Sequence, residues 1–294
     1  MAHQRIAITG ASGLIGTALV GHLRSEGHTV QKLVRRTTIS SDEISWDPIA
    51  GTVDINALEG VDAVIHLAGA GVGDKRWTSR YRAEILNSRL LGTTAIAQAV
   101  ATVKPSVFIS ASAMGFYGET GNRAVTEIDR PGDDFLATVC KEWEAAADLA
   151  PEVRTVKLRT GLVLDPTGGA LGKMLPLFKF GLGGKLGSGN QWWSWITLHD
   201  QIRAICHLLE SNVSGPVNLT SPNPVTNQEF TSALARALHR PALFPAPAFA
   251  LKLALGGFST EILGSKRVLP QVLLDSGFTF DYPHVTSALA ELVQ

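Results

Sequence analysis

The chain has 294 residues, of which 45% are hydrophobic and 18% charged, a composition typical of a soluble globular protein that excludes a disordered one. Lys plus Arg and Asp plus Glu number 26 each, so no overall field favours nucleic acid or an anionic membrane as partner. Two cysteines, Cys140 and Cys206, are too few for a disulfide framework, and we expect both as reduced thiols in the core.

The first ten residues, MAHQRIAITG, enter a strand-like run almost at once and leave no room for a signal peptide. No apolar run approaches the roughly 20 residues that a membrane helix needs. We therefore expect a cytoplasmic protein, or an organelle-matrix protein whose targeting segment has been removed. The expected partner is an unidentified small molecule, with no nucleic acid and no membrane, and the sequence leaves open a homodimer or a protein partner.

Apolar runs alternate with amphipathic helical patterns along the first half of the chain. The expected strands are 5–10, 28–34, 62–69, 106–112 and 153–160, and the expected helices between them are 14–27, 80–102 and 135–150. The strands are mostly apolar throughout, as strands covered on both faces would be. This alternation predicts an α/β fold, a Rossmann-type doubly wound parallel sheet with right-handed crossovers.

The pattern changes after Leu164. The stretch 165–195 is rich in Gly and Trp without a clear period, and it is too long for a simple connection. Strand and helix patterns return over 195–221, and a mainly helical segment follows. We predict a dinucleotide-binding domain over 1–165, completed by about 196–222. A smaller, mainly helical C-terminal substrate lobe comprises 166–195 and 223–294, with a cleft between the two.

The first expected strand ends in TGASGLIG, which places Gly10, Gly13 and Gly16 just before a helix. Such glycines allow the tight turn, the approach of a pyrophosphate to the backbone, and close packing of helix on strand. Free N–H groups and the positive end of the helix dipole then meet the phosphates. The position between a strand and a helix makes this a credible dinucleotide site. The remaining contacts that we expect from this turn come from Ser12, Leu14 and Ile15.

The second strand ends in VRRT, and no acidic residue occurs until Asp42. An NAD site usually offers a carboxylate to the ribose here, whereas an arginine accommodates the extra phosphate of NADP. Arg35 and Arg36 carry the forked donors that suit a phosphate dianion. The pattern therefore favours NADP(H) over NAD(H), with a pair of solvated surface arginines as the alternative.

With these motifs in hand, the chain resembles the extended short-chain dehydrogenase/reductase superfamily. It is most similar to an atypical branch of uncharacterised NAD-dependent epimerase/dehydratase-like proteins, some described as cell-division-inhibitor-like. The resemblance covers nearly the whole chain and rests on TGASGLIG, HLAGA, SASAMGFYG, LRTGLVL, GLGGKLGSGNQWWSWI and LPQVLLDSGF. It implies that Leu67, Ala68, Gly69 and Val163 line the cofactor. It also implies that Glu84 and Arg89 face the cofactor or the cleft, although a solvated helix face is an alternative for Glu84.

The resemblance also points to candidate catalytic residues, and here the chain departs from the pattern. Enzymatic relatives use a Tyr hydroxyl to pass a proton and a Lys one turn later to lower its pKa. Here Lys141 is present, but position 137 is Ala137, which cannot relay a proton. A helix-surface lysine is the alternative for Lys141 when the tyrosine is missing. Ser112 falls where related reductases keep the hydroxyl that binds the reacting carbonyl. Tyr117 is a further candidate, although in relatives this Tyr-Gly usually shapes a turn.

Other polar residues have a structural interpretation. His66 is expected to be a buried strand residue. His199 precedes Asp200, which can cap a helix, and two roles are open for it: a residue that reaches the cleft, or a structural one, as most such histidines are. No Cys/His spacing indicates a metal. The tryptophans of the segment 181–195 either line a lid or pack between the lobes.

Two functions remain open from the sequence. One is an NADP(H)-dependent oxidoreductase or epimerase-like enzyme acting on a small carbonyl or hydroxyl compound, with the proton supplied by Tyr117, Lys141 or water. The other is a non-catalytic NADP(H)-responsive binding or regulatory protein, which the missing tyrosine favours.

Overall fold

The computed structural model describes residues 3–293. Its centre is an eight-stranded sheet of order β12-β8-β6-β5-β1-β2-β3-β4. The strands are β1 (Arg5–Thr9), β2 (Thr29–Val34), β3 (Glu43–Asp47), β4 (Thr52–Val53), β5 (Ala63–His66), β6 (Val107–Ala113), β8 (Arg154–Thr160) and β12 (Gly215–Leu219). All neighbours run parallel except β3 and β4, which are antiparallel. The carboxyl ends of the parallel strands therefore share one edge of the sheet, called here the carboxyl edge.

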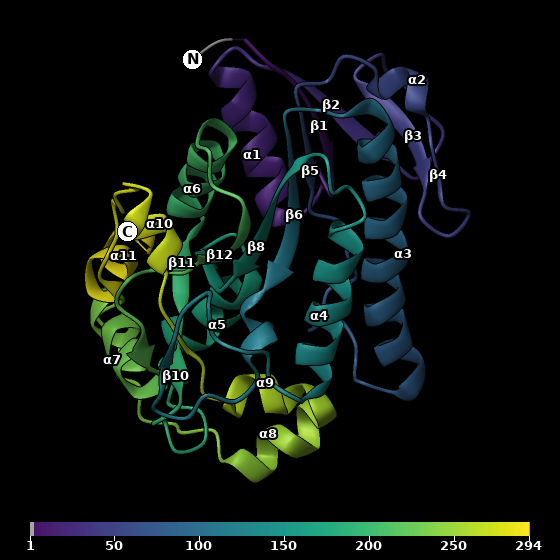
Figure 1. Cartoon of the computed structure of the whole chain (residues 1–294). Coiled ribbons are helices and arrows are strands. Elements are labelled where there is room, and N and C mark those ends of the chain that lie inside the picture. Colours follow the sequence, from purple (N-terminus) through teal and green to yellow (C-terminus); the bar gives the residue numbers. More distant parts are fainter. Residues whose placement is uncertain (1–2, 294) are drawn as a thin grey trace.

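Helices cover both faces of this sheet (Figure 1). On one face α1 (Leu14–Ser25) and α6 (Leu198–Glu210) enclose a core that includes Ile8, Leu19 and Ile205. On the other face α2 (Ile55–Leu58), α3 (Ser79–Val103) and α4 (Phe135–Ala147) enclose a second core. Central strands such as β5 are buried throughout, which explains their continuous apolar sequence. The predicted doubly wound α/β fold is confirmed.

The chain enters α3 and α4 through side-chain caps. Thr78 and Asp134 each accept a hydrogen bond from the backbone N–H three residues later, which satisfies one of the free donors of the first turn. The five predicted strands and three predicted helices are present, with ends shifted by a few residues. The sheet extends further than predicted, because β3 and β4 lie in a segment that showed no strand pattern.

The remaining elements lie beyond the carboxyl edge or beside it (Figure 1). They are η1 (Met114–Tyr117), β7 (Ala124–Val125), β9 (Leu162–Asp165), α5 (Gly169–Lys179), β10 (Trp192–Trp193), β11 (Trp195–Thr197), β13 (Val225–Thr226), α7 (Asn227–Ala237), α8 (Ala248–Leu255), η2 (Gly256–Phe258), α9 (Ser259–Leu263), β14 (Arg267–Val268), α10 (Gln271–Asp275) and α11 (Val285–Leu292). The stretch without a clear period thus contains a helix, α5, with Pro176 inside it.

The segments 166–195 and 223–294 pack against each other. The strands β10 and β13 pair antiparallel, and the Trp193 ring lies 5.2 Å from the Phe230 ring. A third core combines α5, α7 and α11 with the fully buried Trp195. Over residues 3–293, no helix is both long enough and apolar enough to cross a membrane.

Candidate functional site

The glycine-rich turn between β1 and α1 lies at the carboxyl edge. Gly10 has φ of +68°, and a Cβ there would lie 2.8 Å from the Leu67 carbonyl carbon. A Cβ on Gly16 would lie 2.1 Å from the Gly10 oxygen, so only glycine lets the helix approach the strand. Gly13 caps α1 without a side-chain hydrogen bond, and Ser12 and Gly13 are exposed. The first N–H groups of α1 are therefore open to an anion from solvent.

A buried threonine organises the next strand end. The Thr9 hydroxyl accepts hydrogen bonds from the backbone N–H groups of Leu67 and Ala68, at 3.0 and 3.3 Å. It also lies 2.7 Å from Nδ1 of His66. Because the two N–H groups occupy its lone pairs, we infer that the hydroxyl donates its own hydrogen to Nδ1. His66 is fully buried as predicted, and burial lowers its pKa to about 3, so the ring is neutral. Thr9 thereby fixes Leu67 and Ala68 beside Gly10. Thr9 was not predicted from the sequence.

The two arginines after β2 are both exposed but differ in their contacts. Arg36 forms a double ion pair with Glu43 on β3, with Nη1 to Oε2 at 2.9 Å. The exposed side chain of Arg35 makes no hydrogen bond or ion pair within residues 3–293. Arg35 is therefore free to bind a ligand, whereas Arg36 is already paired with Glu43. The sequence did not predict this difference, because it did not predict the strand β3 that carries Glu43.

Glu84 and Arg89 on α3 also differ. Glu84 is exposed and pairs with Lys75, at 3.3 Å. Arg89 lies against the β5 strand end: its Nη1 donates to the carbonyl oxygen of Ala70 at 2.9 Å, and its guanidinium stacks 4.7 Å from the Trp143 ring centre. Burial lowers its pKa. A Cβ on Gly69 would lie 3.4 Å from that guanidinium, so Arg89 brings a positive charge to the carboxyl edge.

The turn after β9 packs against the glycine-rich turn. A Cβ on Gly168 would lie 3.0 Å from the Leu14 side chain, so Leu14 packs against a glycine pair that follows β9. Val163 is half-buried in β9 and pairs with Ile196 of β11. Leu14 and Val163, both expected near the cofactor, therefore belong to neighbouring elements.

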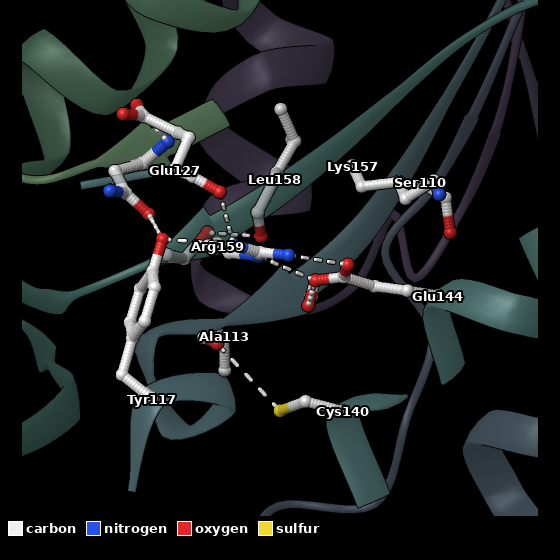
Figure 2. A network of polar contacts seen from close by, with 12 residues as sticks. Ser110, Ala113, Tyr117, Glu127, Cys140, Glu144, Lys157, Leu158 and Arg159 are labelled. Carbon is white, nitrogen blue, oxygen red and sulfur yellow. Dashed lines mark hydrogen bonds and ion pairs between the residues drawn. The ribbon is translucent and has the colours of Figure 1, made fainter. Parts of the chain in front are cut away.

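Behind the end of β6 lies a buried ion pair (Figure 2). Arg159 on β8 donates from Nε and Nη2 to the two carboxylate oxygens of Glu144 on α4, at 2.8 and 2.9 Å. The Ser112 hydroxyl donates to Oε1 of the same Glu144 at 2.7 Å. All three side chains are buried. The predicted carbonyl-binding hydroxyl is thus already engaged within the protein.

The network continues through Tyr117. Its hydroxyl donates to Oδ1 of Asn218 at 2.7 Å and accepts from Nη1 of Arg159 at 2.9 Å. Burial raises the pKa of Tyr117 to about 12, against the opposing effect of Arg159. A neutral, fully hydrogen-bonded phenol is a poor proton donor, so the structural interpretation of Tyr117 fits the geometry. The phenol ties η1 to β8 and β12.

Glu127 completes this network from the loop after β7. Its Oε1 accepts from the backbone N–H groups of Asn218 and Val272, at 2.9 and 3.2 Å. Its Oε2 is buried without a hydrogen-bond partner in the described part of the chain. Burial raises the pKa of Glu127. Glu144, Arg159, Glu127 and Asn218 were not predicted from the sequence, because only the packing of α4, β8, β12 and the loop after β7 brings them together.

The opening turns of α4 carry no Tyr–Lys pair, as the alanine at position 137 indicated. Ala137 is fully buried, whereas Lys141, one turn later, is exposed. The side chain that faces the end of β6 is Cys140, whose Sγ lies 3.7 Å from the Ala113 carbonyl oxygen. Burial raises the pKa of Cys140 to about 12, which leaves a protonated thiol. Cys140 and Cys206 are both free and buried, as predicted.

The tryptophans of the segment 181–195 pack between segments. Trp195 donates from Nε1 to the Asn223 carbonyl at 3.2 Å, and Trp192 donates to Oδ1 of Asn122 at 3.1 Å. The same segment is hydrogen-bonded to residues 244–246 through Gly183, Lys185 and Gly187. Of the two roles considered, packing between segments is the one that the structure shows.

His199 lies away from this network. Its Nε2 is 2.7 Å from an Asp281 oxygen, and with Asp200 these residues gather three metal-ligand atoms. Nη1 of Arg203 already contacts both carboxylates, at 3.0 and 3.2 Å. Asp200 further accepts the backbone N–H groups of residues 281 and 282. The two carboxylates of the cluster therefore already share one arginine, and the cluster joins α6 to the C-terminal segment.

The sequence of the chain is similar to those of known proteins. Residues 6–220 match the NAD dependent epimerase/dehydratase family. The chain belongs to that family. Residues 246–292 match a second family, described as a domain of unknown function. An epimerase family protein of Mycobacterium bovis is 44% identical over 293 residues, which are 98% of this chain and 97% of that protein. A chloroplastic epimerase family protein SDR39U1 homolog of Arabidopsis thaliana is 36% identical over 301 residues, 98% of this chain and 86% of that protein.

Solved structures of epimerase-family proteins share the fold. The human epimerase family protein SDR39U1 (isoform 2), crystallised with NADPH, superposes with a TM-score of 0.91 at 33% identity, covering 98% of each chain. A nucleoside-diphosphate sugar epimerase from Corynebacterium glutamicum gives a TM-score of 0.80 at 35% identity, covering 99% of this chain and 58% of that one. The resemblance predicted from the motifs is confirmed.

Proposed function

We propose that this epimerase-family protein binds NADP(H) at the turn between β1 and α1. The observation that carries the proposal is the uncapped, solvent-open start of α1 beside the exposed guanidinium of Arg35. The N–H groups of Ser12, Leu14 and Ile15 would hold the pyrophosphate, since that of Gly13 already donates to the Gly10 carbonyl at 3.0 Å. Arg35 would bind the adenosine-side phosphate, and Arg36 would do so if it left Glu43. The relative crystallised with NADPH supports this choice of cofactor.

Other residues would complete the cofactor site. Leu67, Ala68 and Gly69 follow β5 at the same edge, where Thr9 holds the first two close to Gly10. Arg89 would supply positive charge near the phosphates, because its side chain lies against Gly69 and Ala70. Leu14 and Val163 would provide apolar walls. Glu84 would lie at the rim, since it is exposed and pairs with Lys75.

The activity that we propose is hydride exchange between the nicotinamide and a small carbonyl or hydroxyl compound, as an oxidoreductase or epimerase-like enzyme. The cofactor supplies the hydride chemistry when bound. The side chains of Ser112 and Tyr117 would act by fixing the end of β6 and η1 instead of moving the proton, since both are held in the buried network. A water molecule, or Lys141 after a change of rotamer, would deliver the proton.

A second candidate is a non-catalytic NADP(H)-responsive binding protein. Ala137 offers no hydroxyl, and the hydroxyls of Ser112 and Tyr117 are hydrogen-bonded to Glu144 and Asn218. In this role, bound cofactor would order the loops at the carboxyl edge, and a protein partner would bind to that ordered surface.

Turnover separates the two candidates. The purified chain would be mixed with NADPH and a panel of aldehydes, ketones and quinones, and loss of NADPH would be followed by absorbance. The enzyme proposal predicts consumption above the protein-free rate for at least one compound class. If NADPH binds but no class is reduced, and no oxidation of matching alcohols occurs with NADP⁺, the enzyme proposal is wrong and the binding role holds.

A further inference from the structure

The helix α8 presents an apolar and basic face to solvent. No residue of α8 (Ala248–Leu255) is fully buried, although its sequence is AFALKLAL. Phe249 and Leu253 are 74% and 75% exposed and lie four residues apart, so they share one side of the helix. Lys252, also exposed, lies between them on that side. An exposed apolar helix face of this kind has a purpose in most proteins.

A second segment is joined to the chain that leads into α8. Phe244 and Ala246, just before α8, donate backbone hydrogen bonds to Gly183 and Lys185, at 3.1 and 2.9 Å. Nε of Arg240 donates to the Lys179 carbonyl at 3.2 Å. The end of α5 and the loop after it are therefore joined to the chain that leads into α8. We call the exposed residues of 173–185 and 239–253 the apolar–basic surface.

This surface concentrates exposed hydrophobic side chains. Thirteen large hydrophobic residues are exposed among those the structure describes, and seven lie in 177–182 and 243–253. Phe180 is 81% exposed and Leu243 is 74% exposed. Fully exposed Phe and Leu side chains lose hydration favourably when they enter an apolar medium. Their number in so short a length of chain indicates a docking surface.

The charge of the surface selects its partner. The segments 173–185 and 239–253 contain five Lys or Arg residues and no Asp or Glu, in a chain whose net charge is zero. A second copy would bring like charges together across a two-fold interface, which is unfavourable. Phe, Leu and Lys on one exposed helix side are instead the residues that enter the headgroup boundary, with the Lys reaching the phosphates.

We propose that the apolar–basic surface docks the protein on an anionic lipid bilayer. Phe249 and Leu253 would insert between headgroups, while Lys179, Arg240 and Lys252 would meet lipid phosphates. Nη1 of Arg76, in the loop after β5, donates to the Leu253 carbonyl at 3.2 Å, which fixes α8 to the carboxyl edge. The bilayer would therefore face the end of the molecule that carries the cofactor site. The zero net charge of the whole chain gives no sign of this basic surface. The surface forms only in the folded protein, where its two segments come together.

Vesicle co-sedimentation of the full chain tests the proposal. The probes are vesicles of phosphatidylcholine alone and vesicles rich in phosphatidylglycerol. We expect binding to the anionic vesicles only, weakening as salt rises. The variant Lys252→Glu with Leu253→Ser should bind about tenfold or more weakly. The matched control Ile128→Ser with Arg130→Glu changes the same residue classes at an exposed position elsewhere and should bind like the unmodified chain.

Three outcomes would overturn the proposal. The first is no binding to anionic vesicles at low salt, and the second is equal loss of binding in the control variant. The third is a concentration-dependent dimer that Lys252→Glu with Leu253→Ser dissociates, because the surface would then belong to a second copy. NADPH titration of the same samples distinguishes these outcomes from a failure of the proposed cofactor site, since neither variant touches α1 or Arg35.

Discussion

Arg159 and Glu144 form a bidentate ion pair inside the protein, with both side chains less than a tenth exposed. Hydrogen bonds and the charge of Glu144 raise the pKa of Arg159, although burial acts in the opposite direction and is the largest single effect. The pair holds α4 against β8. The Ser112 hydroxyl on β6 donates to Glu144, and the Tyr117 hydroxyl on η1 accepts from Arg159. These buried polar side chains are thus hydrogen-bonded to one another, and they stabilise the carboxyl edge from behind.

Removing one charge of this pair should be costly. We expect Glu144→Gln to lower the free energy of unfolding by about 3–5 kcal/mol, because it leaves the Arg159 guanidinium buried without a counter-charge. Ser112→Ala removes one hydrogen bond to the same carboxylate and should cost only about 1 kcal/mol. Urea unfolding measures both values. Equal stabilities of the two variants would mean that the ion pair is not the centre of the network.

The raised pKa of Tyr117 predicts how the stability of the protein changes at alkaline pH. Its folded value is about 12, above its ordinary value of 10.0, so the stability that it contributes is complete below pH 10. That stability is lost as pH rises from 10 toward 12. Tyr117→Phe should lower the free energy of unfolding by about 1–3 kcal/mol near neutral pH and reduce its dependence on alkaline pH. The check is unfolding by urea at several alkaline pH values; the proposal for Tyr117 fails if both proteins lose stability in parallel.

The lowered pKa of His66 predicts a loss of stability at acidic pH. Burial lowers its pKa to about 3 from 6.5, so its neutral form is required in the folded chain. The stability it contributes is present above pH 6.5 and is lost as pH falls toward 3, at about 1.4 kcal/mol per pH unit. His66→Gln should flatten this acid limb. Thermal unfolding between pH 7 and pH 4 compares the two proteins, and an unchanged slope in the variant would exclude His66 as its source.

The glycines of α1 provide a matched pair. A Cβ on Gly16 would collide with the Gly10 backbone, whereas a Cβ on Gly21 would meet nothing within 4 Å. Gly16→Ala should therefore destabilise the chain and weaken NADPH binding. Gly21→Ala should raise the free energy of unfolding by about 0.5–1 kcal/mol and leave binding unchanged. Thermal unfolding and cofactor titration of both variants test this. The interpretation of the turn is wrong if Gly16→Ala binds normally.

Local patterns in the sequence predicted the features that depend on neighbours in the chain. The strands, the helices and the glycine-rich turn follow from apolar periodicity and from glycine spacing. The Arg159–Glu144 pair was not predicted, because each residue alone looks like a surface charge and only the packing of α4 on β8 joins them. Likewise, Glu43 on the unpredicted β3 decides that Arg36 is engaged while Arg35 is open. The side of α4 that faces the sheet depended on packing too: Cys140 contacts the end of β6, whereas Lys141 lies on the surface, which was the alternative considered for it.

The central claim is that the start of α1 and the exposed guanidinium of Arg35 bind NADP(H). Titration of NADPH and NADH, followed by nicotinamide fluorescence, tests it most directly in the unmodified chain, in Arg35→Ala and in Arg35→Ala with Arg36→Ala. We predict that NADPH binds more tightly than NADH, and that Arg35→Ala weakens NADPH by about tenfold or more while NADH is unaffected. The double variant should lose the remaining preference. Equal affinity for the two cofactors, or a preference for NADPH that survives in the double variant, would contradict the account.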